Sequence, residues 1–158
     1  MVHATAVDGL KGGRLRVGMI GGGRNAFIGA VHRMAMRLDD LIDLKAGALS
    51  SDAQNARASG ADLGLATDRS YSDYREMAIR EAARPDGIEA AVIVTPNHLH
   101  FPVAKAFLEA GIDVICDKPL STTLAEASEL VALTRAKGLI FAVTLNNTGY
   151  PWCARREK

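Results

Sequence analysis

The sequence predicts an α/β fold, doubly wound, with a mostly parallel six-stranded sheet and helices on both faces. Short apolar segments alternate with helical patterns along the chain, and the connections between them are short. Several of these segments, such as 90–94 and 139–143, are continuous apolar runs typical of strands covered on both faces. Three consecutive glycines also separate the first strand pattern from the first helical pattern. At 158 residues the chain is long enough for one such domain.

The first predicted strand covers residues 15–20, and a helical pattern follows from about Ala26 to residue 38. A strand, a glycine turn and a helix in this order are typical of the first unit of a dinucleotide-binding domain. The glycines and Ala26 fit the spacing G-x-G-x-x-A. By itself this pattern is weak, because Gly-Gly-Gly is also an ordinary flexible turn.

Each position of the pattern has an expected physical role. Gly21 can adopt the positive φ of a tight turn. Because Gly23 has no Cβ, a pyrophosphate could approach its backbone, and Ala26 stands where a third glycine usually lets helix and strand pack closely. The helix that follows offers unpaired N–H groups and a positive dipole end to phosphates.

The remaining elements follow in order. We expect further strands over 41–49, around Tyr71, and over 90–94, 113–116 and 139–143. We expect further helices from Ser51 to about 63, from 73 to 83, from about 98 to 110, and from 123 to 137. Ser51 is the expected N-cap of the first of these, and Thr123 with Glu126 forms a capping-box pattern for the last.

Composition and charge exclude several classes of function. The net charge is +1 without blocks of like charge, so nucleic acid is not an expected partner. No apolar run reaches the ~20 residues of a membrane span, and residues 1–13 lack the apolar centre of a signal peptide. We therefore expect no membrane partner, a cytoplasmic protein, and a mobile leader over 1–13. Cys116 and Cys153 form no metal or redox motif, and the spacing of His98 and His100 does not place them on one helix face, so we predict no metal site.

Polar residues gather where the predicted strands end, which is where ligands bind in this fold class. They are the glycine turn, Ser50-Ser51, Thr95-Pro96-Asn97-His98-Leu99-His100, Asp117-Lys118-Pro119, and Asn146. Several motifs at equivalent strand ends indicate one ligand site more strongly than any one of them.

These motifs resemble the glucose–fructose oxidoreductase / inositol dehydrogenase / rhizopine-catabolism family of NAD(P)-dependent oxidoreductases over about residues 14–150. The resemblance rests on the glycine turn with His32 in the next helix, on Val94-Thr95-Pro96-Asn97 with His100, on Asp117-Lys118-Pro119, and on the last strand leading to Asn146. It implies a Rossmann fold, NAD or NADP as cofactor, and a sugar, cyclitol or related polyol as the substrate whose CH–OH group reacts. It leaves a homo-oligomer open.

The resemblance also implies roles for individual residues. Lys118 would be catalytic, contacting the substrate hydroxyl and helping the proton relay, in a Glu-Lys-Pro motif where Asp117 replaces the usual Glu; a cis Lys118–Pro119 bond is implied too. The residues implied to bind the cofactor are Gly21, Gly22, Gly23, Arg24, Asn25, Ala26, Ser50, Ser51, Thr95, Pro96, Asn97, His100, Asp117, Lys118 and Asn146.

Other interpretations of these residues remain. Lys118 could be a solvated lysine at a strand end, His32 could be structural, and the serines could cap a helix. No acid stands where the second strand ends, since Asp52 comes two or three residues late, so the choice between NAD and NADP stays open. Ser50, Ser51 or Arg57 could accept a 2′-phosphate.

The expected domain organisation is a dinucleotide-binding domain over 14–150 followed by an atypical tail over 151–158. The resemblance implies a C-terminal substrate domain, which we expect to be absent from this chain. We therefore expect an incomplete, truncated oxidoreductase. The alternative is a nucleotide-binding module that works alone without catalytic turnover.

Overall fold

A computed structural model describes residues 13–146 of the chain. The expected leader except Gly13, the tail over 151–158 and Cys153 lie outside the described residues. The elements in chain order are β1 (Leu15–Gly21), α1 (Phe27–Leu38), β2 (Ile42–Ala48), α2 (Ala53–Asp62), the 3₁₀ turn η1 (Thr67–Arg69), α3 (Tyr74–Ala82), β3 (Ala90–Val94), the 3₁₀ turn η2 (Asn97–Leu99), α4 (His100–Glu109), β4 (Asp113–Asp117), α5 (Leu124–Lys137) and β5 (Phe141–Thr144).

The five strands form one sheet in the order β2-β1-β3-β4-β5, and every pairing is parallel. The fold class is confirmed, but the prediction of six strands is wrong. The segment around Tyr71 contacts β2 only through a bridge between Gly47 and Ser70 and a hydrogen bond from Tyr71 N to Gly47 O of 2.8 Å.

A buried polar cluster explains why this segment does not continue as a strand. Arg69 is 5% exposed and forms an ion pair with Glu81 of α3, which is 1% exposed. The Tyr71 hydroxyl donates to the same carboxylate at 2.8 Å. These side chains tie the segment to α3, so its backbone follows β2 for only one bridge.

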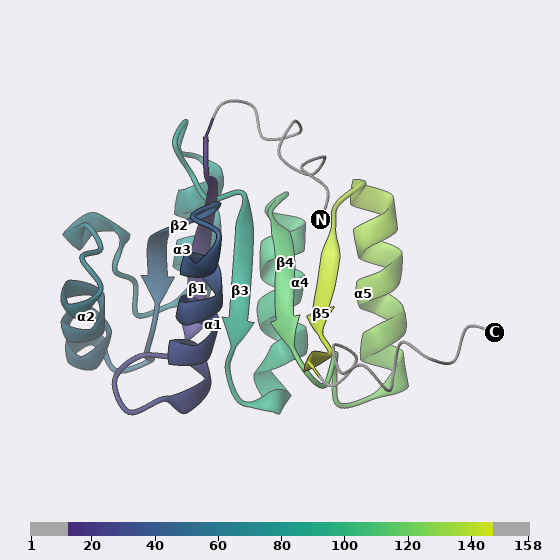
Figure 1. The fold of residues 1–158 in the computed structure, drawn as a ribbon. Helices are drawn as coiled ribbons and strands as arrows, with labels where there is room; N and C mark the ends of the chain where they lie inside the picture. Colours follow the sequence, from purple (N-terminus) through teal and green to yellow (C-terminus); the bar gives the residue numbers. More distant parts are fainter. Residues whose placement is uncertain (1–12, 147–158) are drawn as a thin grey trace, which may run out of the picture.

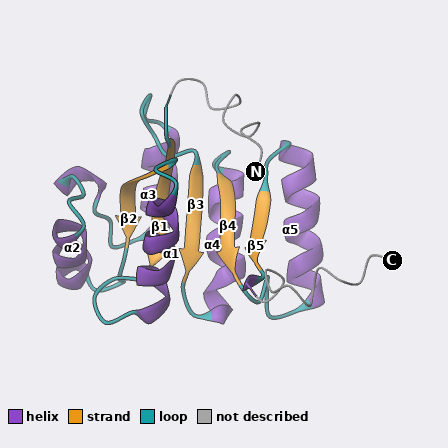
Figure 2. Ribbon diagram, viewed as in Figure 1, coloured by secondary structure: helices purple, strands orange, loops and turns teal. Residues whose placement is uncertain are grey.

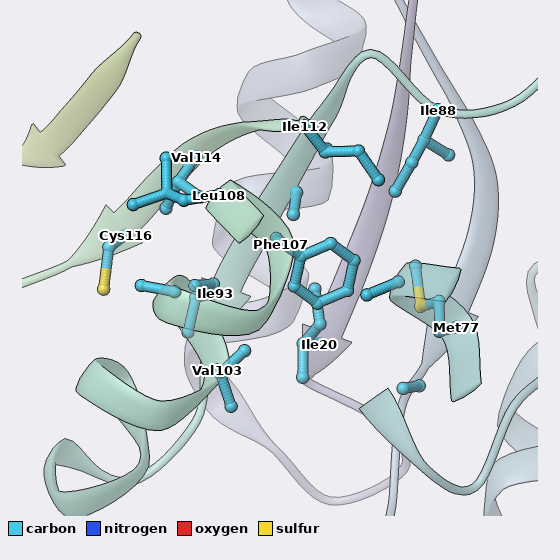
Figure 3. Packing of buried hydrophobic residues seen from close by; sticks show 14 of the residues in the cluster. Ile20, Met77, Ile88, Ile93, Val103, Phe107, Leu108, Ile112, Val114 and Cys116 are labelled. Carbon is cyan, nitrogen blue, oxygen red and sulfur yellow. The ribbon is translucent and has the colours of Figure 1, made fainter. Parts of the chain in front are cut away.

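Helices cover the two faces of the sheet unequally. Helix α1 lies over one face in front of β1, while α3 and α4 lie behind the sheet (Figure 1). The larger core cluster joins the rear face of the sheet to α3, α4 and α5. Phe107 of α4 is fully buried there, among labelled side chains that include Ile20, Met77 and Ile112 (Figure 3). The sheet therefore has a thick hydrophobic core on one side, which makes it a rigid base for the loops at its edges.

Helix caps explain several boundaries. The Thr123–Glu126 capping box of α5 is present, as predicted. The predicted cap of α2 is wrong: Asp52, rather than Ser51, is the N-cap, and its carboxylate accepts from Asn55 N at 2.7 Å. An aspartate competes well with serine at this position. No described helix is long and apolar enough to cross a membrane.

Candidate functional site

The predicted site residues meet at one edge of the sheet. All five strands point to this edge (Figure 2). Gly21 at the end of β1 is paired with Val94 at the end of β3, and Ile93 of β3 is paired with Cys116 of β4. Thr95 and Lys118 follow these strand ends directly, so the loop residues after β1, β3 and β4 lie side by side as predicted.

The glycine loop between β1 and α1, residues 21–26, has an unusual backbone. Gly21, Gly22 and Asn25 have φ values of 81°, 73° and 68°. Glycine adopts this region without strain, and asparagine tolerates it better than most residues. The guanidinium of Arg33, on α1, donates to the carbonyl oxygen of Gly22 at 2.7 Å and so holds the loop from the side of the helix.

Gly23 has a steric reason within the protein to lack a side chain. A Cβ on this residue would lie 2.7 Å from the carbonyl oxygen of Leu49 and 2.8 Å from Ser59 Oγ. The Gly23 N–H also donates to Leu49 O at 3.2 Å. The missing side chain therefore lets the loop approach the end of β2 and helix α2, and the expected approach of a pyrophosphate to Gly23 stays a prediction.

Gly29, rather than Ala26, makes the close contact between helix and loop. Ala26 is the N-cap of α1. A Cβ on Gly29 would lie 2.4 Å from Gly22 Cα, so the helix reaches the loop only because both residues lack side chains. The sequence interpretation missed Gly29. Two signals pointed to it: the turn before α1 is about three residues longer than usual, and Gly29 itself stands in the first turn of the helix.

Helix α1 begins without a side-chain cap, and its first turn holds no acidic residue. Helix α4 also begins without a side-chain cap, whereas Asp52, Asp73 and Thr123 cap α2, α3 and α5. The free N–H groups and the positive end of the helix dipole make such a terminus attractive to a phosphate. The N–H groups of Gly23, Arg24 and Ala26 already donate within the protein, which leaves the N–H groups of the first turn of α1 as candidate donors for an anion.

A cavity of about 410 Å³ adjoins this terminus. It is lined by Gly22, Gly23, Arg24, Asn25, Ala26, Phe27, Ala30, Arg33, Ser59, Asp62 and Leu63. Arg24 donates to Asp62 from Nε at 2.6 Å and from Nη2 at 2.8 Å. This pair lowers the pKa of the Asp62 carboxyl, chiefly through the hydrogen bond from Arg24. Arg24 is therefore shared with a carboxylate and is not an unpaired cation at the cavity.

The residues after β2 form a connected polar chain. Ser50 Oγ accepts from Asp52 N at 3.2 Å and from Asn55 Nδ2 at 3.3 Å. Ser59 Oγ donates to Asn55 Oδ1 at 3.3 Å and accepts from Arg24 N at 3.0 Å. Asp52, the acid that follows β2, caps α2, and Ser51 is exposed. The structure thus connects Ser50 to the glycine loop through α2.

The loop after β3 contains one polar atom that lacks a partner. Thr95 Oγ1 is buried without a hydrogen bond in the part of the chain that the structure describes, while Pro96 and Asn97 are exposed. His100 is 1% exposed, so its ring lies inside the protein behind this loop. Its Nδ1 is 2.6 Å from Pro119 O, and its Nε2 is 3.0 Å from Thr95 O.

The loop after β4 presents Lys118 at the surface. Asp117 Oδ1 accepts from Lys118 N at 3.0 Å and from Thr144 Oγ1 at 2.7 Å, which ties the end of β4 to the end of β5. The Lys118–Pro119 peptide bond is cis, as the resemblance implied. Asn146, two residues beyond β5, is exposed.

His32 of α1 lies within electrostatic reach of Asp117. Burial lowers the pKa of its imidazole, and the charge of Asp117 partly opposes that effect. The described residues contain no group of three or more His, Cys, Asp or Glu side chains that could hold a metal ion.

Comparisons with a family model, with curated proteins and with solved structures all match this chain to oxidoreductases. Residues 15–145 match the family model GFO_IDH_MocA, described as an oxidoreductase family with an NAD-binding Rossmann fold. The chain is 45% identical over 136 residues to the uncharacterized oxidoreductase YfiI of Bacillus subtilis (strain 168), a match that covers 85% of this chain and 35% of that protein.

Two solved structures are similar as well. An oxidoreductase from Sinorhizobium meliloti is 57% identical with a TM-score of 0.81, covering 87% of this chain and 38% of the other. An inositol dehydrogenase homologue from Azotobacter vinelandii, complexed with NADH and myo-inositol, is 43% identical with a TM-score of 0.85, covering 87% and 36%. The chain therefore spans little more than a third of the length of these relatives.

Proposed function

This chain belongs to the GFO_IDH_MocA oxidoreductase family and contains its NAD-binding domain, and from this premise we propose that it serves an oxidoreductase acting on the CH–OH group of a sugar, cyclitol or related polyol. The observation that carries the proposal is the uncapped N-terminus of α1 beside the glycine loop. The myo-inositol bound by the Azotobacter vinelandii relative supports a polyol as the substrate class.

The described residues fit a dinucleotide that crosses the edge of the sheet. The first turn of α1 would hold the pyrophosphate, and Ser50 and Ser51 would lie near the adenosine ribose. The buried Thr95 Oγ1 lacks a partner, which suits a hydrogen bond to the cofactor near its nicotinamide end. Arg57, Ser50 and Ser51 remain candidates for a 2′-phosphate, so NADP is as suitable a cofactor as NAD.

Lys118 is the proposed catalytic residue. When bound, a nicotinamide cofactor would supply the hydride chemistry for the carbinol carbon of the substrate. The side chain of Lys118, on an exposed loop beside Thr95, would orient the substrate hydroxyl. As a neutral amine it would accept the hydroxyl proton when the substrate is oxidised, and as an ammonium group it would return that proton in the reverse direction. Asp117 positions this loop through its bonds to Lys118 N and Thr144 Oγ1.

We further propose that residues 13–146 bind the cofactor without steady turnover. Correct positioning of a substrate supplies about 7–11 kcal/mol of barrier reduction, and one lysine cannot fix both the distance and the angle of hydride transfer. The groups that would complete the site are then contributed from outside this domain. This is the second candidate function, a nucleotide-binding module, and what favours it is that Lys118 is the one proposed catalytic group among the described residues.

One experiment tests both proposals. The purified chain is titrated with NADH and with NADPH, followed by calorimetry, and is then assayed with a panel of inositols and aldoses by nicotinamide absorbance. We expect binding of at least one cofactor and no turnover. Absence of binding to either would contradict the cofactor site, and steady turnover that disappears in Lys118→Ala would contradict the need for further groups.

A further inference from the structure

We propose that Arg33 is a positioning residue for the cofactor, because its guanidinium keeps the carbonyl oxygen of the Gly22–Gly23 peptide turned away from the phosphate site. This inference rests on the proposed function, since that site is the N-terminus of α1. The sequence interpretation gave Arg33 no role in cofactor binding, although it stands only a few residues after the glycine turn.

Both polar groups of the Gly22–Gly23 peptide have partners within the protein. Arg33 Nη1 donates to Gly22 O at 2.7 Å, and the Gly23 N–H donates to Leu49 O at 3.2 Å. The peptide is therefore bonded to α1 through its oxygen and to the residue directly after β2 through its nitrogen. The direction of the Arg33 bond is certain, because a guanidinium only donates and a carbonyl oxygen only accepts.

The carbonyl oxygen of Gly22 faces the flank of α1. Arg33 lies in the second turn of the helix, so its guanidinium approaches the loop from the body of the helix. A Cβ on Gly29 would lie 2.6 Å from the same oxygen, which places the oxygen against the side of the helix. The free N–H groups at the N-terminus point along the helix axis instead. The oxygen is thus kept from facing a phosphate bound at that terminus.

This orientation needs support because the peptide lies between two glycines. Turning the peptide over changes ψ of Gly22 and φ of Gly23, and neither residue has a Cβ that would oppose the rotation. Gly22 already has a φ of 73°. The reversed peptide would lose both of its hydrogen bonds and direct a carbonyl dipole, which repels anions, toward the phosphate site. Arg33 therefore serves the cofactor through this peptide.

The charge of Arg33 makes this bond a strong one. Among residues 13–146, the hydrogen bonds of its guanidinium go to Gly22 O and to Met19 Sδ at 3.4 Å, and not to a carboxylate. Burial, and to a smaller extent the charge of Arg37, lowers the pKa of the Arg33 guanidinium. A hydrogen bond from such a cation to a carbonyl is stronger than one between neutral groups. Arg24, in the same loop, is instead engaged by Asp62.

The orientation of the peptide is tested first without any cofactor. We expect the Gly23 amide to give one narrow signal in nitrogen-15 NMR of the wild-type chain. In Arg33→Met, which keeps an apolar stem but has no donor, the Gly23 signal should broaden or split as the peptide samples both orientations. A single narrow Gly23 signal in a folded Arg33→Met variant would overturn the proposal.

The effect on the phosphate site is tested by NMR titration with ADP and with adenosine, which lacks the pyrophosphate. We expect Arg33→Met to weaken ADP binding at least about tenfold and to leave adenosine binding unchanged. Arg37→Met is the matched control, because Arg37 is an exposed arginine one turn further along α1. It removes the same charge and should change neither affinity.

Equal weakening of ADP binding in Arg33→Met and Arg37→Met would assign the effect to positive charge in general and would overturn the role. Equal weakening of ADP and adenosine in Arg33→Met would indicate a general loss of structure and would overturn it too. A wild-type chain that binds neither NADH nor ADP would contradict the proposed function, whereas the Gly23 signal would still decide whether Arg33 holds the peptide.

Arg33→Lys provides a test by rescue. The lysine keeps a charged donor on a long stem, so its affinity for ADP should lie between that of Arg33→Met and that of the wild type. An affinity no better than that of Arg33→Met would count against the role. If Arg33→Met does not fold, Arg33→Lys replaces it, with an expected loss of about threefold for ADP, comparable to a weakened hydrogen bond. Wild-type affinity for ADP in that variant would then contradict the proposal.

Discussion

A Cβ atom on Gly29 would lie 2.4 Å from Gly22 Cα and 2.6 Å from Gly22 O, so α1 and the glycine loop meet backbone to backbone. Replacing Gly29 by alanine must therefore separate the helix from the loop. We expect Gly29→Ala to lower the free energy of unfolding by about 1–3 kcal/mol, as overpacked sites do, and to weaken NADH binding. Urea unfolding and calorimetric titration measure the two effects.

Gly13→Ala is the matched control for this substitution. A Cβ on Gly13 would have no neighbour within 4 Å, and its φ is not positive. Stability and NADH affinity should both stay at the wild-type value. Wild-type affinity in Gly29→Ala would show that the cofactor does not depend on the contact between α1 and the loop.

Because the N-terminus of α1 has no side-chain cap, we expect a new cap there to raise stability and to weaken NADH binding. In Ala26→Asp the new carboxylate would cap the helix and complement its dipole, which should raise the free energy of unfolding by about 0.5–1 kcal/mol. The same charge would repel a pyrophosphate and occupy its donors, so we expect NADH affinity to fall at least about tenfold, or 1.4 kcal/mol. Thermal unfolding and calorimetry provide the readouts.

Asp73→Ala serves as the control at a distant helix. Removing this cap of α3 should reduce stability by about 1 kcal/mol and leave NADH affinity unchanged. If Ala26→Asp bound NADH as tightly as the wild type, the pyrophosphate could not lie at the first turn of α1.

We expect the folded chain to lose stability at high pH because the Tyr71 hydroxyl is buried. Burial, followed by the hydrogen bond and charge of Glu81, raises the pKa of the Tyr71 hydroxyl to about 12. In the unfolded chain this group titrates near ~10, so between these values the folded state alone keeps the proton and stability falls as pH rises. The full effect is about 2–3 kcal/mol by pH ~12.

The variant Tyr71→Phe isolates this contribution from other groups that titrate at high pH. At pH 8 it should be less stable than the wild type by about 1 kcal/mol, because it lacks the hydrogen bond to Glu81. Urea midpoints measured at pH 8, 10 and 11 should show this difference shrinking with pH. A constant difference would contradict the assignment.

Cys116 should be chemically inert in the folded chain. It is fully buried in β4, and burial, with a smaller effect from Asp117, raises the pKa of its thiol to about 12. Reactivity requires the thiolate. We expect iodoacetamide at pH 8 to leave the Cys116 peptide unmodified in native chain and to alkylate it in urea, as read by peptide mass mapping. Alkylation of Cys116 in the folded chain would contradict this prediction and would mean that β4 and β5 separate readily.

The sequence alone predicted the fold class and the position of the polar motifs after β3 and β4 at one edge of the sheet, because both depend on strong local signals. The strands β3 and β4 are continuous apolar runs, and each is followed at once by a polar motif that breaks it. The capping box of α5 was predicted for the same reason, since Thr123 and Glu126 are close in sequence.

The errors arose where distant residues decide the outcome. The segment at Tyr71 has strand-like residues, but Arg69 and Glu81 draw it to α3 instead of along β2. The role of Gly29 depends on a contact across the loop to Gly22. The two carbonyl partners of His100 belong to different loops, so no spacing in the sequence indicates them.

The short contact between Gly47 and the Ser70–Tyr71 segment also affects how this sheet could grow. A bare outer strand offers its unpaired N–H and C=O groups to any other chain, which can lead to aggregation. On the outer side of β2, Tyr71 N already donates a hydrogen bond to the carbonyl oxygen of Gly47. The buried ion pair between Arg69 and Glu81 holds the Ser70–Tyr71 segment in place. Among the described residues β5 pairs only with β4, so a sixth strand, from the same polypeptide or another, would join most readily beside β5. Of the two outer strands, β2 is thus the one whose far side is partly covered within the described residues.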